Sequence, residues 1–382
     1  MKSRVAVIRC NGYDTEKVEK AIQTGIELLG GISAFADKGE TLLLKPNVLS
    51  GVAPQKHVTT HPAVFKAVAV AMQKADIKLQ YGDSPAVGKY SGALKRAGVS
   101  DVAEELGISL ADFEQGRDIF YKEGRQNKSF SIANGVLQCD GLISLAKLKT
   151  HGFQKYTGCI KNQFGCIPGL RKSEFHFKLT DAFDFARMLV DLDRFIRPRL
   201  YIMDAITGME GNGPQNGSPA EMNVLLFSTD PVALDATACR MIELDPLRVP
   251  VIRVAAEAGI GAHAQKDIEL SGDSLPSYPD FDVDRKPLRP YRTKGIRQFL
   301  SQIITLKPVI RRERCIKCGK CVEVCPTDPK AVDWPQKNHG QPPQHDYKLC
   351  IRCYCCQEVC PEDAIGLKKP LMRKIIDGLI FK

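Results

Sequence analysis

The chain has 382 residues, of which 43% are hydrophobic and 26% are charged. This composition is typical of a folded, soluble protein and excludes the disordered and fibrous classes, and the length predicts a large domain with a smaller one. The net charge of +10 is uneven, because residues 285–382 contain 21 Lys and Arg but 9 Asp and Glu. The basic excess therefore lies at the C-terminal end.

No run of about eighteen apolar residues occurs, and the chain passes from Met1 almost directly into a predicted strand. We therefore expect no signal peptide and a cytoplasmic location. Most of the 14 cysteines are crowded into one segment. In a long chain without a secretory signal, such crowding favours metal binding over disulfides.

Short apolar runs alternate with segments of helical period up to about Leu270. This pattern is typical of an α/β fold, in which a mainly parallel sheet is covered by helices. The predicted strands are 5–9, 41–44, 78–81, 141–145, 200–203 and 224–228. The predicted helices are 15–29, 62–74, 183–195 and 231–243. Thr60-His61-Pro62 is a typical helix start, with a hydroxyl residue available to cap and Pro at the first helical position, and Asp230-Pro231 repeats the arrangement.

Polar side chains follow these predicted strands, at the positions where open parallel sheets bind ligands. The candidate ligand-binding residues are Lys45, Asn47, Asp83, Ser84, Asp204 and Asp230. Each alone is more simply explained as a helix cap or a turn residue. Together they predict a site, because charged groups gathered at one sheet edge are costly to bury unpaired.

A glycine-punctuated loop at 157–169 contains Lys161 and Asn162 and suits contact with phosphate or carboxylate. A phosphate-bearing or other anionic ligand is therefore an expectation for the large domain. The five cysteines outside the crowded segment are expected to be small core or loop residues.

Several prolines and aspartates between Ser271 and Pro290 predict an extended linker. We divide the chain into an α/β domain over 1–270, a linker with an amphipathic helix over 271–304, a cysteine-rich domain over 305–369 and an amphipathic helix over 370–382. The two amphipathic helices are expected to pack on the cysteine-rich domain. Binding to a membrane surface is the alternative.

Two cysteine runs share one spacing, Cys-x-x-Cys-x-x-Cys-x-x-x-Cys-Pro, and begin at Cys315 and Cys350. In proteins with two [4Fe-4S] clusters, three closely spaced cysteines ligate one cluster and the fourth, before Pro, ligates the other. By this crossed rule the first cluster is assigned to Cys315, Cys318, Cys321 and Cys360. The second cluster is assigned to Cys350, Cys353, Cys356 and Cys325.

Zinc is the alternative metal, since paired cysteines also form tetrahedral zinc sites. A three-cysteine run followed by Cys-Pro, present twice, is hard to explain with zinc. Cys355 breaks the repeat, and we expect it to be an additional thiol beside the cluster, with a role as a swapped ligand left open.

Residues 312–366 resemble the bacterial ferredoxins with two [4Fe-4S] clusters, apart from an insert at 333–348. The resemblance implies a small α+β domain that transfers electrons. The basic residues of this segment would offset the negative charge of the clusters. Nucleic acid is not an expected partner, because few aromatic residues are interleaved with the basic ones.

Residues 5–261 resemble the prokaryotic family known as domain of unknown function 362, which is often fused to a ferredoxin module. The resemblance is carried by Lys-Pro-Asn at 45–47, Gly-Asp-Ser-Pro at 82–85, Lys-Thr-His at 149–151 and the segment 228–235. The family name implies no settled chemistry.

A looser resemblance, to the nickel-pincer lactate racemases, is carried by His151, Lys161 and Pro168-Gly169. It implies that the His moves a proton and the Lys holds a cofactor. The chain departs from that pattern after Pro-Gly, where His176 has a different context. Lys149, His151 and Lys161 are the candidate catalytic residues.

Three functions remain open from the sequence. In the first, which we favour, the clusters exchange electrons with a ligand or partner of the α/β domain, as in an oxidoreductase. In the second, the protein is a pure electron carrier and the large domain is a docking module. In the third, a non-redox isomerase or transferase acts on an anionic metabolite, and the clusters are structural. The expected partner is a redox protein or a small anion, and no nucleotide fingerprint of the G-x-G-x-x-G type follows a strand.

Overall fold

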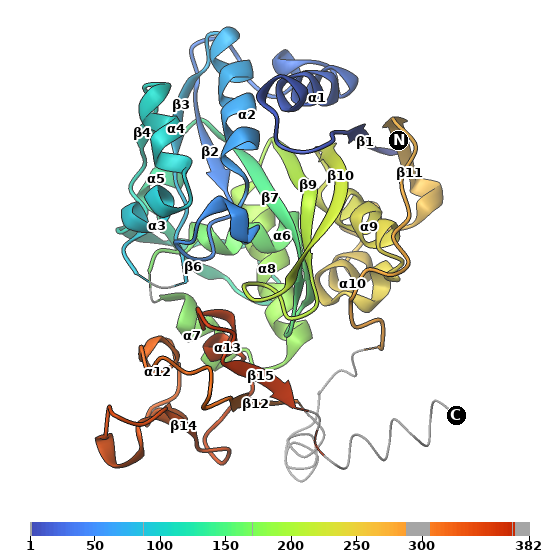
Figure 1. Ribbon diagram of the computed structural model, residues 1–382. Coiled ribbons are helices and arrows are strands. Elements are labelled where there is room, and N and C mark those ends of the chain that lie inside the picture. Colours follow the sequence, from blue (N-terminus) through green and yellow to red (C-terminus); the bar gives the residue numbers. More distant parts are fainter. Residues whose placement is uncertain (1, 87, 170, 288–305, 369, 371–382) are drawn as a thin grey trace. The chain divides into compact units, whose positions relative to one another are not determined.

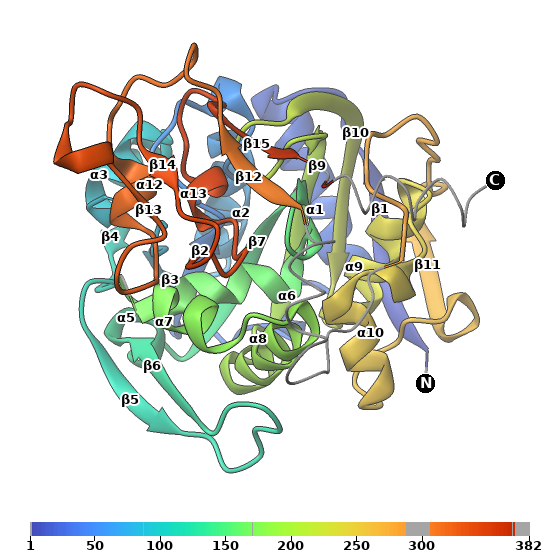
Figure 2. The same ribbon diagram turned by 90° about the horizontal axis from the view of Figure 1, so that it is seen from below.

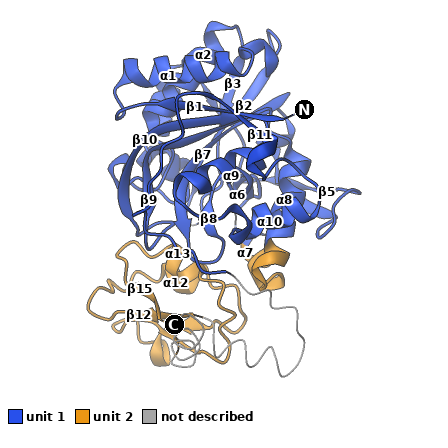
Figure 3. Ribbon diagram, turned by 90° about the vertical axis from the view of Figure 1, so that its right-hand side faces the viewer, with its two compact units in different colours: residues 1–172, 186–287 blue, residues 173–185, 288–382 orange. Residues whose placement is uncertain are grey.

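The computed structural model describes residues 2–86, 88–169, 171–287, 306–368 and 370 (Figure 1). It divides into two compact units, shown in separate colours in Figure 3. The α/β unit comprises residues 1–172 and 186–287, and the cysteine unit comprises residues 173–185 and 288–382. Residues 271–287, expected to be linker, thus belong to the α/β unit. There the guanidinium of Arg285 donates hydrogen bonds to the carbonyls of Ile242 and Glu243.

A nine-stranded sheet forms the centre of the α/β unit, with the strand order β11-β1-β10-β9-β7-β2-β3-β4 and β8 paired to β7. The strands are β1 Ser3–Arg9, β2 Thr41–Pro46, β3 Lys78–Tyr81, β4 Ser109–Leu110, β7 Gly141–His151, β8 Lys155–Thr157, β9 Leu200–Glu210, β10 Ser218–Ser228 and β11 Ile268–Gly272. Five of the pairings are parallel. β10 runs antiparallel to both β1 and β9. The predicted α/β class with a mainly parallel sheet is confirmed, whereas the reversed direction of β10 was not predicted.

Helices cover both faces of this sheet (Figure 1). They are α1 Thr15–Leu28, α2 Pro62–Lys74, α3 Tyr90–Arg96, α4 Val99–Glu105, α5 Asn134–Leu137, α6 Cys159–Asn162, α8 Ala182–Ile196, α9 Pro231–Met241 and α10 Pro250–Glu257, with α7 Arg171–Lys178 beginning in this unit and ending in the other. The main apolar core lies between the sheet and the face formed by α1, α2 and α4. A hairpin of β5 Gly116–Phe120 and β6 Ser129–Ala133 extends from the edge of the unit (Figure 2).

Local sequence explains where α1 and α2 begin. Asp14 caps α1 by accepting a hydrogen bond from the backbone N–H of Lys17. Pro62 occupies the first position of α2 as expected, but the cap is His61, whose Nδ1 accepts from the N–H of Ala63. The hydroxyl of Thr60, expected to be available as a cap, instead donates to the carbonyl of Leu145 on β7.

Two predicted strands continue further than their apolar runs. β7 extends beyond Leu145 to His151, and β9 extends beyond Met203 to Glu210. Lys147, Lys149 and Asp204 therefore lie within strands and not after them. A strand can carry these charges in its buried interior because each of them has a polar partner there.

Within residues 306–368, the cysteine unit is a small α+β unit with two antiparallel strand pairs and two short helices. The elements are β12 Lys307–Ile310, β13 Val332–Asp333, β14 Gln344–His345, β15 Ile365–Lys368, α12 Lys320–Glu323 and α13 Cys355–Glu358. β12 pairs with β15, and β13 pairs with β14. Its core combines cysteines with Val332, Ala364 and Ile365. The predicted amphipathic helices at 295–304 and 370–381 lie outside the described residues.

Among the helices in the described ranges, none is both long enough and apolar enough to cross a membrane.

Candidate functional site

A buried ion pair lies at the middle of the sheet, where β7 and β9 are neighbours. Lys147 and Asp204 are direct partners in the β7–β9 register. The Nζ of Lys147 lies 2.8 Å from the Oδ2 of Asp204, and neither side chain is exposed. Burial lowers the pKa of Lys147, and the adjacent carboxylate opposes this effect. The pair is thus a buried charge centre whose ammonium is easier to deprotonate than that of an exposed lysine.

Three ring side chains lie beside this ion pair. The hydroxyl of Tyr13 donates to Oδ1 of Asp204 at 2.9 Å and accepts from Nζ of Lys147 at 2.9 Å. The ring of Tyr13 stacks on that of His61, with centroids 3.7 Å apart. The ring of His57 is also nearly parallel to that of Tyr13, at a longer centroid distance of 6.4 Å. Burial raises the pKa of Tyr13 and lowers that of His61 to about 4. The half-buried rings therefore connect the charge centre to the exterior in uncharged form.

A second buried ion pair lies further along the sheet, at the end of β2. The Nζ of Lys45 lies 2.8 Å from Oδ1 of Asp83, and the two side chains are almost completely buried. The other carboxylate oxygen of Asp83 accepts from the backbone N–H of Val48 at 2.6 Å. The amide oxygen of Asn162 accepts from Lys45 at 3.3 Å. The carboxylate and the ammonium therefore each have further partners besides one another.

Asn47 extends this polar group towards Lys149. Its side-chain nitrogen donates to the oxygen of Asn162 at 3.2 Å, and its side-chain oxygen accepts from Nζ of Lys149 at 2.7 Å. The backbone N–H of Asn47 donates to the hydroxyl of Thr60. The residue after Thr60, His61, donates its backbone N–H to the carboxylate of Asp204. The segment 60–61 therefore joins the two ion-pair centres. Asn47 is half-buried, so this is a point at which the polar interior reaches the surface of the unit.

A third polar pair involves Ser84 and Lys172. The Nζ of Lys172 donates to Oγ of Ser84 at 2.5 Å and to the carbonyl of Ile167 at 2.9 Å. The backbone N–H of Gly169 also donates to Oγ of Ser84, at 3.0 Å. Burial lowers the pKa of Lys172 to about 7, and the nearby carboxylate of Asp83 only partly opposes this effect. Lys172 is thus a lysine that can act as a base near neutral pH.

The glycine-punctuated loop packs against carboxylates of the protein itself. A Cβ at Gly165 would lie 1.9 Å from Oδ1 of Asp83, and a Cβ at Gly158 would lie 2.1 Å from Oδ1 of Asp235. Asp235 on α9 accepts from the backbone N–H groups of Cys159 and Ile160 at the start of α6. Only glycine permits this close approach. The loop was expected to contact an anionic ligand, and in the structure it contacts internal carboxylates.

Most of the predicted binding residues meet in one polar network, which contains Lys45, Asn47, Asp83, Ser84, Lys149 and Asp204. Asp230 does not join it, because β10 is antiparallel and ends at the opposite edge of the sheet, with Ser228 opposite Tyr201. Both oxygens of Asp230 are used there, one by the first turn of α9 and one by Ser3 and Ala262. Its expected position with the others is therefore corrected to that of a helix cap.

The two remaining candidate catalytic residues have different surroundings. The Nδ1 of His151 accepts from the backbone N–H groups of Phe153 and Gln154, which closes the turn between β7 and β8. Lys161 is half-buried in α6. Its neighbour Asn162 is the member of that helix that hydrogen-bonds both Lys45 and Asn47.

Sequence reasoning did not single out Tyr13, His61 or Lys172 as site residues. Tyr13 directly precedes Asp14, the cap of α1. Lys172 belongs to a short helix outside the predicted elements. The sequence did contain a signal for His61. This residue lies directly before Pro62, at the start of the helix that follows the candidate residues Lys45 and Asn47. None of these positions lies directly after a strand.

The cysteine unit contains two cavities that are lined by cysteines. The first has a volume of about 360 Å³, including space open to solvent, and its cysteines are Cys315, Cys318, Cys321 and Cys360. The second has a volume of about 310 Å³ on the same basis, and its cysteines are Cys325, Cys350, Cys353 and Cys356. Each cavity thus combines three cysteines of one run with the fourth of the other.

The side chains around the second cavity fit an anionic metal group. Arg352 is 6% exposed, and within the part of the chain that the structure describes its Nε and Nη1 have no hydrogen-bond partner. A buried cation with such nitrogens requires a nearby anion. Four thiolates around iron and sulfide would carry net negative charge and would supply that anion. Cys355 is buried and precedes Cys356 in the chain, but it does not line the cavity.

Comparison with known families gives two matches. A family model described as "Domain of unknown function (DUF362)" matches residues 42–240. A second model, described as a 4Fe-4S dicluster domain, matches residues 314–364. A protein of Synechocystis named as thylakoid-associated is 34% identical over 265 residues, which cover 69% of this chain and 82% of that protein.

Two solved structures show weaker similarity. The lactate racemase apoprotein from Thermoanaerobacterium thermosaccharolyticum has a TM-score of 0.40 and 11% identity, with coverage of 63% of this chain and 57% of that one. A Thermotoga maritima protein has a TM-score of 0.30 and 10% identity, with coverage of 57% and 56%. The chain thus spans less than two thirds of either protein, and at these values the similarity carries no argument about function.

Proposed function

Because the chain belongs to the DUF362 family and carries a 4Fe-4S dicluster domain, we propose that this iron-sulfur protein transfers electrons through two [4Fe-4S] clusters. The observation that supports this function best is the pair of cavities, each with four cysteines drawn from both runs. When bound, each cluster would supply a one-electron redox centre. Two such centres in one small unit suit a relay, whereas one would be enough to stabilise a fold.

The proposed ligand sets follow from the cavity linings. Cys315, Cys318, Cys321 and Cys360 would hold the first cluster, and the remaining four cysteines of the two runs would hold the second. The cysteine side chains bind iron as thiolates. The backbone N–H of Ala364 already donates to Sγ of Cys360 at 3.3 Å, which stabilises that sulfur as a thiolate. The side chains that line the cavities are otherwise largely apolar, so they limit the access of water to the bound metal.

The electrons are proposed to pass to or from an anionic ligand of the α/β unit, which would make the protein an oxidoreductase. The half-buried Asn47, Tyr13 and His61 are the groups through which such a ligand could reach the two ion-pair centres. Lys45 and Lys149 supply positive charge behind Asn47. Lys149, His151 and Lys161 remain the proposed catalytic residues, and Lys172 is added to them as a base near neutral pH.

A non-redox enzyme is the second candidate, and the charge centre of Lys147, Asp204 and Tyr13 favours it. Groups with shifted pKa values that hydrogen-bond one another are typical of acid–base catalysis. In that case an isomerase or transferase would act on an anionic metabolite, and the clusters would be structural. Reversible reduction of the clusters without any effect on turnover would support this candidate.

The proposed partner is an acidic electron carrier. Arg312, Arg314, Lys317 and Lys320 are exposed along the first cysteine run, and Cys318 between them is exposed as well. Ile316, which is 60% exposed, supplies an apolar contact in the same stretch. We call this stretch, residues 312–320, the basic edge. Opposite charges guide two proteins to each other, so an acidic carrier would meet the basic edge above the first cavity.

The proposed location is the cytoplasm. The name of the Synechocystis relative raises attachment to a membrane surface as the alternative. Flotation of the protein with anionic phospholipid vesicles, with and without residues 370–382, separates the two. Co-flotation that disappears with the truncation would support the membrane alternative.

The proposed function is tested by anaerobic purification followed by counting of iron and sulfide. We expect iron and sulfide for two [4Fe-4S] clusters, and a spectrum that bleaches reversibly on reduction. Mass spectrometry of co-purified small molecules would then identify the ligand class of the α/β unit. Colourless protein that contains zinc would refute the proposal.

A further inference from the structure

The two halves of the cysteine unit are related by an offset of 35 residues, since Cys315 corresponds to Cys350. The backbone follows the same repeat. Lys317 and Arg352, which occupy corresponding positions between two cysteines, both have a φ of 61°. The backbone thus has the same local conformation at these two positions, while the side chains there differ.

Side-chain donors contact two sulfurs at the second cavity. The Nε2 of His345 lies 3.4 Å from Sγ of Cys356, and the hydroxyl of Thr327 lies 3.3 Å from Sγ of Cys325. A cysteine that binds iron is a thiolate without a proton, so in each pair the nitrogen or oxygen must be the donor. The residue that corresponds to His345 in the first half is Ile310, which has no polar group.

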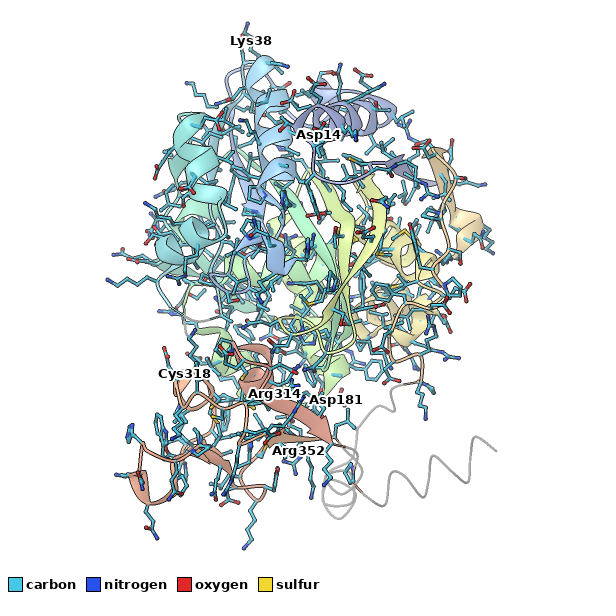
Figure 4. All side chains as sticks on the ribbon, in the orientation of Figure 1. Asp14, Lys38, Asp181, Arg314, Cys318 and Arg352 are labelled. Carbon is cyan, nitrogen blue, oxygen red and sulfur yellow. The ribbon has the colours of Figure 1, made fainter. Side chains whose placement is uncertain are left out.

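Arg352 adds a buried cation at the same cavity. Its guanidinium packs over the ring of Tyr347, 5.0 Å from the centroid, and the residue is 6% exposed. The corresponding Lys317 in the first half is exposed, so water screens its charge. Figure 4 labels Arg352 and Cys318, which lie apart in the cysteine unit.

These contacts favour the reduced form of a cluster in the second cavity. Reduction adds negative charge, and hydrogen bonds and a buried cation stabilise that charge most strongly where water is excluded. At the first cavity, water at the exposed Cys318 and the backbone N–H of Ala364 at Cys360 act in the same direction, but the described residues add no buried cation there. At the second cavity, side-chain donors reach two of the four sulfurs, and the buried guanidinium of Arg352 adds a positive charge.

We propose that the cavity lined by Cys325, Cys350, Cys353 and Cys356 holds the cluster of higher reduction potential. An electron that enters at the cluster of the first cavity, where Cys318 is exposed, is then held at equilibrium mainly by the cluster of the second cavity. His345, Thr327 and Arg352 are the positioning residues that set this order. The inference rests on the proposed function, because it requires both clusters to be present.

The test is a redox titration of the anaerobically purified full chain, followed by electron paramagnetic resonance. In the wild-type protein we expect two separate one-electron steps. Arg352→Gln removes the buried cation, and Lys317→Gln makes the same change at the corresponding exposed position. We expect Arg352→Gln to lower the reduced-to-oxidised ratio of the higher-potential cluster about tenfold at a fixed ambient potential, equal to a shift of about 59 mV. Lys317→Gln should leave both clusters within twofold of wild type.

His345→Phe keeps a ring beside Tyr347 but removes the N–H donor, and Thr327→Val is a smaller change at another sulfur of the same cavity. Both should lower the potential of the same cluster as Arg352→Gln. If one of these variants loses its clusters, the others still decide the question.

The inference is overturned if the wild-type protein shows two equal potentials. It is also overturned if the variants shift the lower-potential cluster, or neither cluster, while their iron content stays that of wild type. Iron-free wild-type protein is a different result and would refute the proposed function itself.

Discussion

The ammonium of Lys147 lies 2.8 Å from the carboxylate of Asp204, and both side chains are fully buried on neighbouring strands. Lys147→Met would remove the cation and leave the carboxylate in an apolar interior with neutral donors only. Loss of one partner of a buried pair costs about 3–5 kcal/mol. We therefore expect the free energy of unfolding to fall by about 3 kcal/mol, measured by urea denaturation followed by far-ultraviolet circular dichroism.

The matched control for this change is Lys38→Met. Lys38 also forms an ion pair, with Asp76 at 2.6 Å, but the side chains of both residues are largely exposed. The urea midpoint of this variant should stay close to that of wild type. Equal effects of the two substitutions would show that the buried pair does not hold the two strands together.

The crossed arrangement of cysteines predicts which substitutions act alike. Cys360 and Cys318 line the same cavity although they belong to different runs. Cys360→Ala and Cys318→Ala should therefore abolish or alter the same paramagnetic signal of the reduced protein. Cys325→Ala should act on the other signal, together with Cys353→Ala. If Cys360→Ala instead matched Cys353→Ala, each run would ligate its own cluster and the crossed assignment would be wrong.

Lys172 predicts a dependence of stability on alkaline pH. Burial lowers its pKa in the folded protein to about 7, from 10.5. Between these values the unfolded chain binds more protons than the folded chain, so the contribution of Lys172 to stability rises with pH. From pH 7 to pH 9 the contribution of Lys172 to the free energy of unfolding should increase by about 2 kcal/mol. The gain is lost as the pH falls towards 7.

Lys172→Met should remove this rise, because methionine does not titrate. The measurement is the difference in unfolding free energy between variant and wild type at the two pH values, so that other titrating groups cancel. Lys78→Met, at an exposed position of β3 in the same unit, is the control and should retain the rise. A variant that keeps the wild-type slope would mean that Lys172 stays charged in the folded protein up to pH 9.

The basic edge predicts the charge of the partner. Lys317→Glu combined with Lys320→Glu reverses two exposed charges next to Cys318. We expect electron exchange with a plant-type [2Fe-2S] ferredoxin, an acidic protein, to slow about tenfold at low ionic strength, and the difference to vanish at high salt.

Cytochrome c, a basic protein, is the probe of opposite charge. The Lys317→Glu, Lys320→Glu double variant should reduce it faster than the wild-type protein does. Lys337→Glu combined with Lys348→Glu, two exposed positions outside the basic edge, is the matched control. Equal effects of the two double variants would show that overall charge, and not the basic edge, governs the encounter.

The elements with a clear period could be predicted from the sequence. Pro62–Lys74 and Lys78–Tyr81 begin and end where expected, because Pro at a helix start and a short alternating run are local signals. The direction of β10 could not be predicted in this way. The predicted runs 200–203 and 224–228 left a long gap between them, whereas in the structure β9 reaches Glu210 and β10 begins at Ser218, so that a short connection joins them as an antiparallel pair. This direction decides that Asp230 lies away from the site.

The binding residues that follow strands were found because parallel strands end at a common edge. Tyr13, His61 and Lys172 lie on a loop, a helix cap and a short helix, so they reach the site only through tertiary packing. The cysteine repeat is the opposite case. Its spacing is itself the chemical signal, and the two cavities are lined by the eight cysteines of that pattern.

Each cavity is lined by three cysteines of one run and the last cysteine of the other, so both halves of the cysteine unit contribute to both cavities. Neither half alone contains the four thiols that line a cavity, so a fragment that ends between β13 and β14 would lack a complete site of either kind. A single cut in that connection should, in contrast, leave two pieces that metal still fastens together. Under the proposed assignment, a partly synthesised chain has no complete set of four cysteines until Cys356 has been added, and the set of the first cavity is complete only when Cys360 follows.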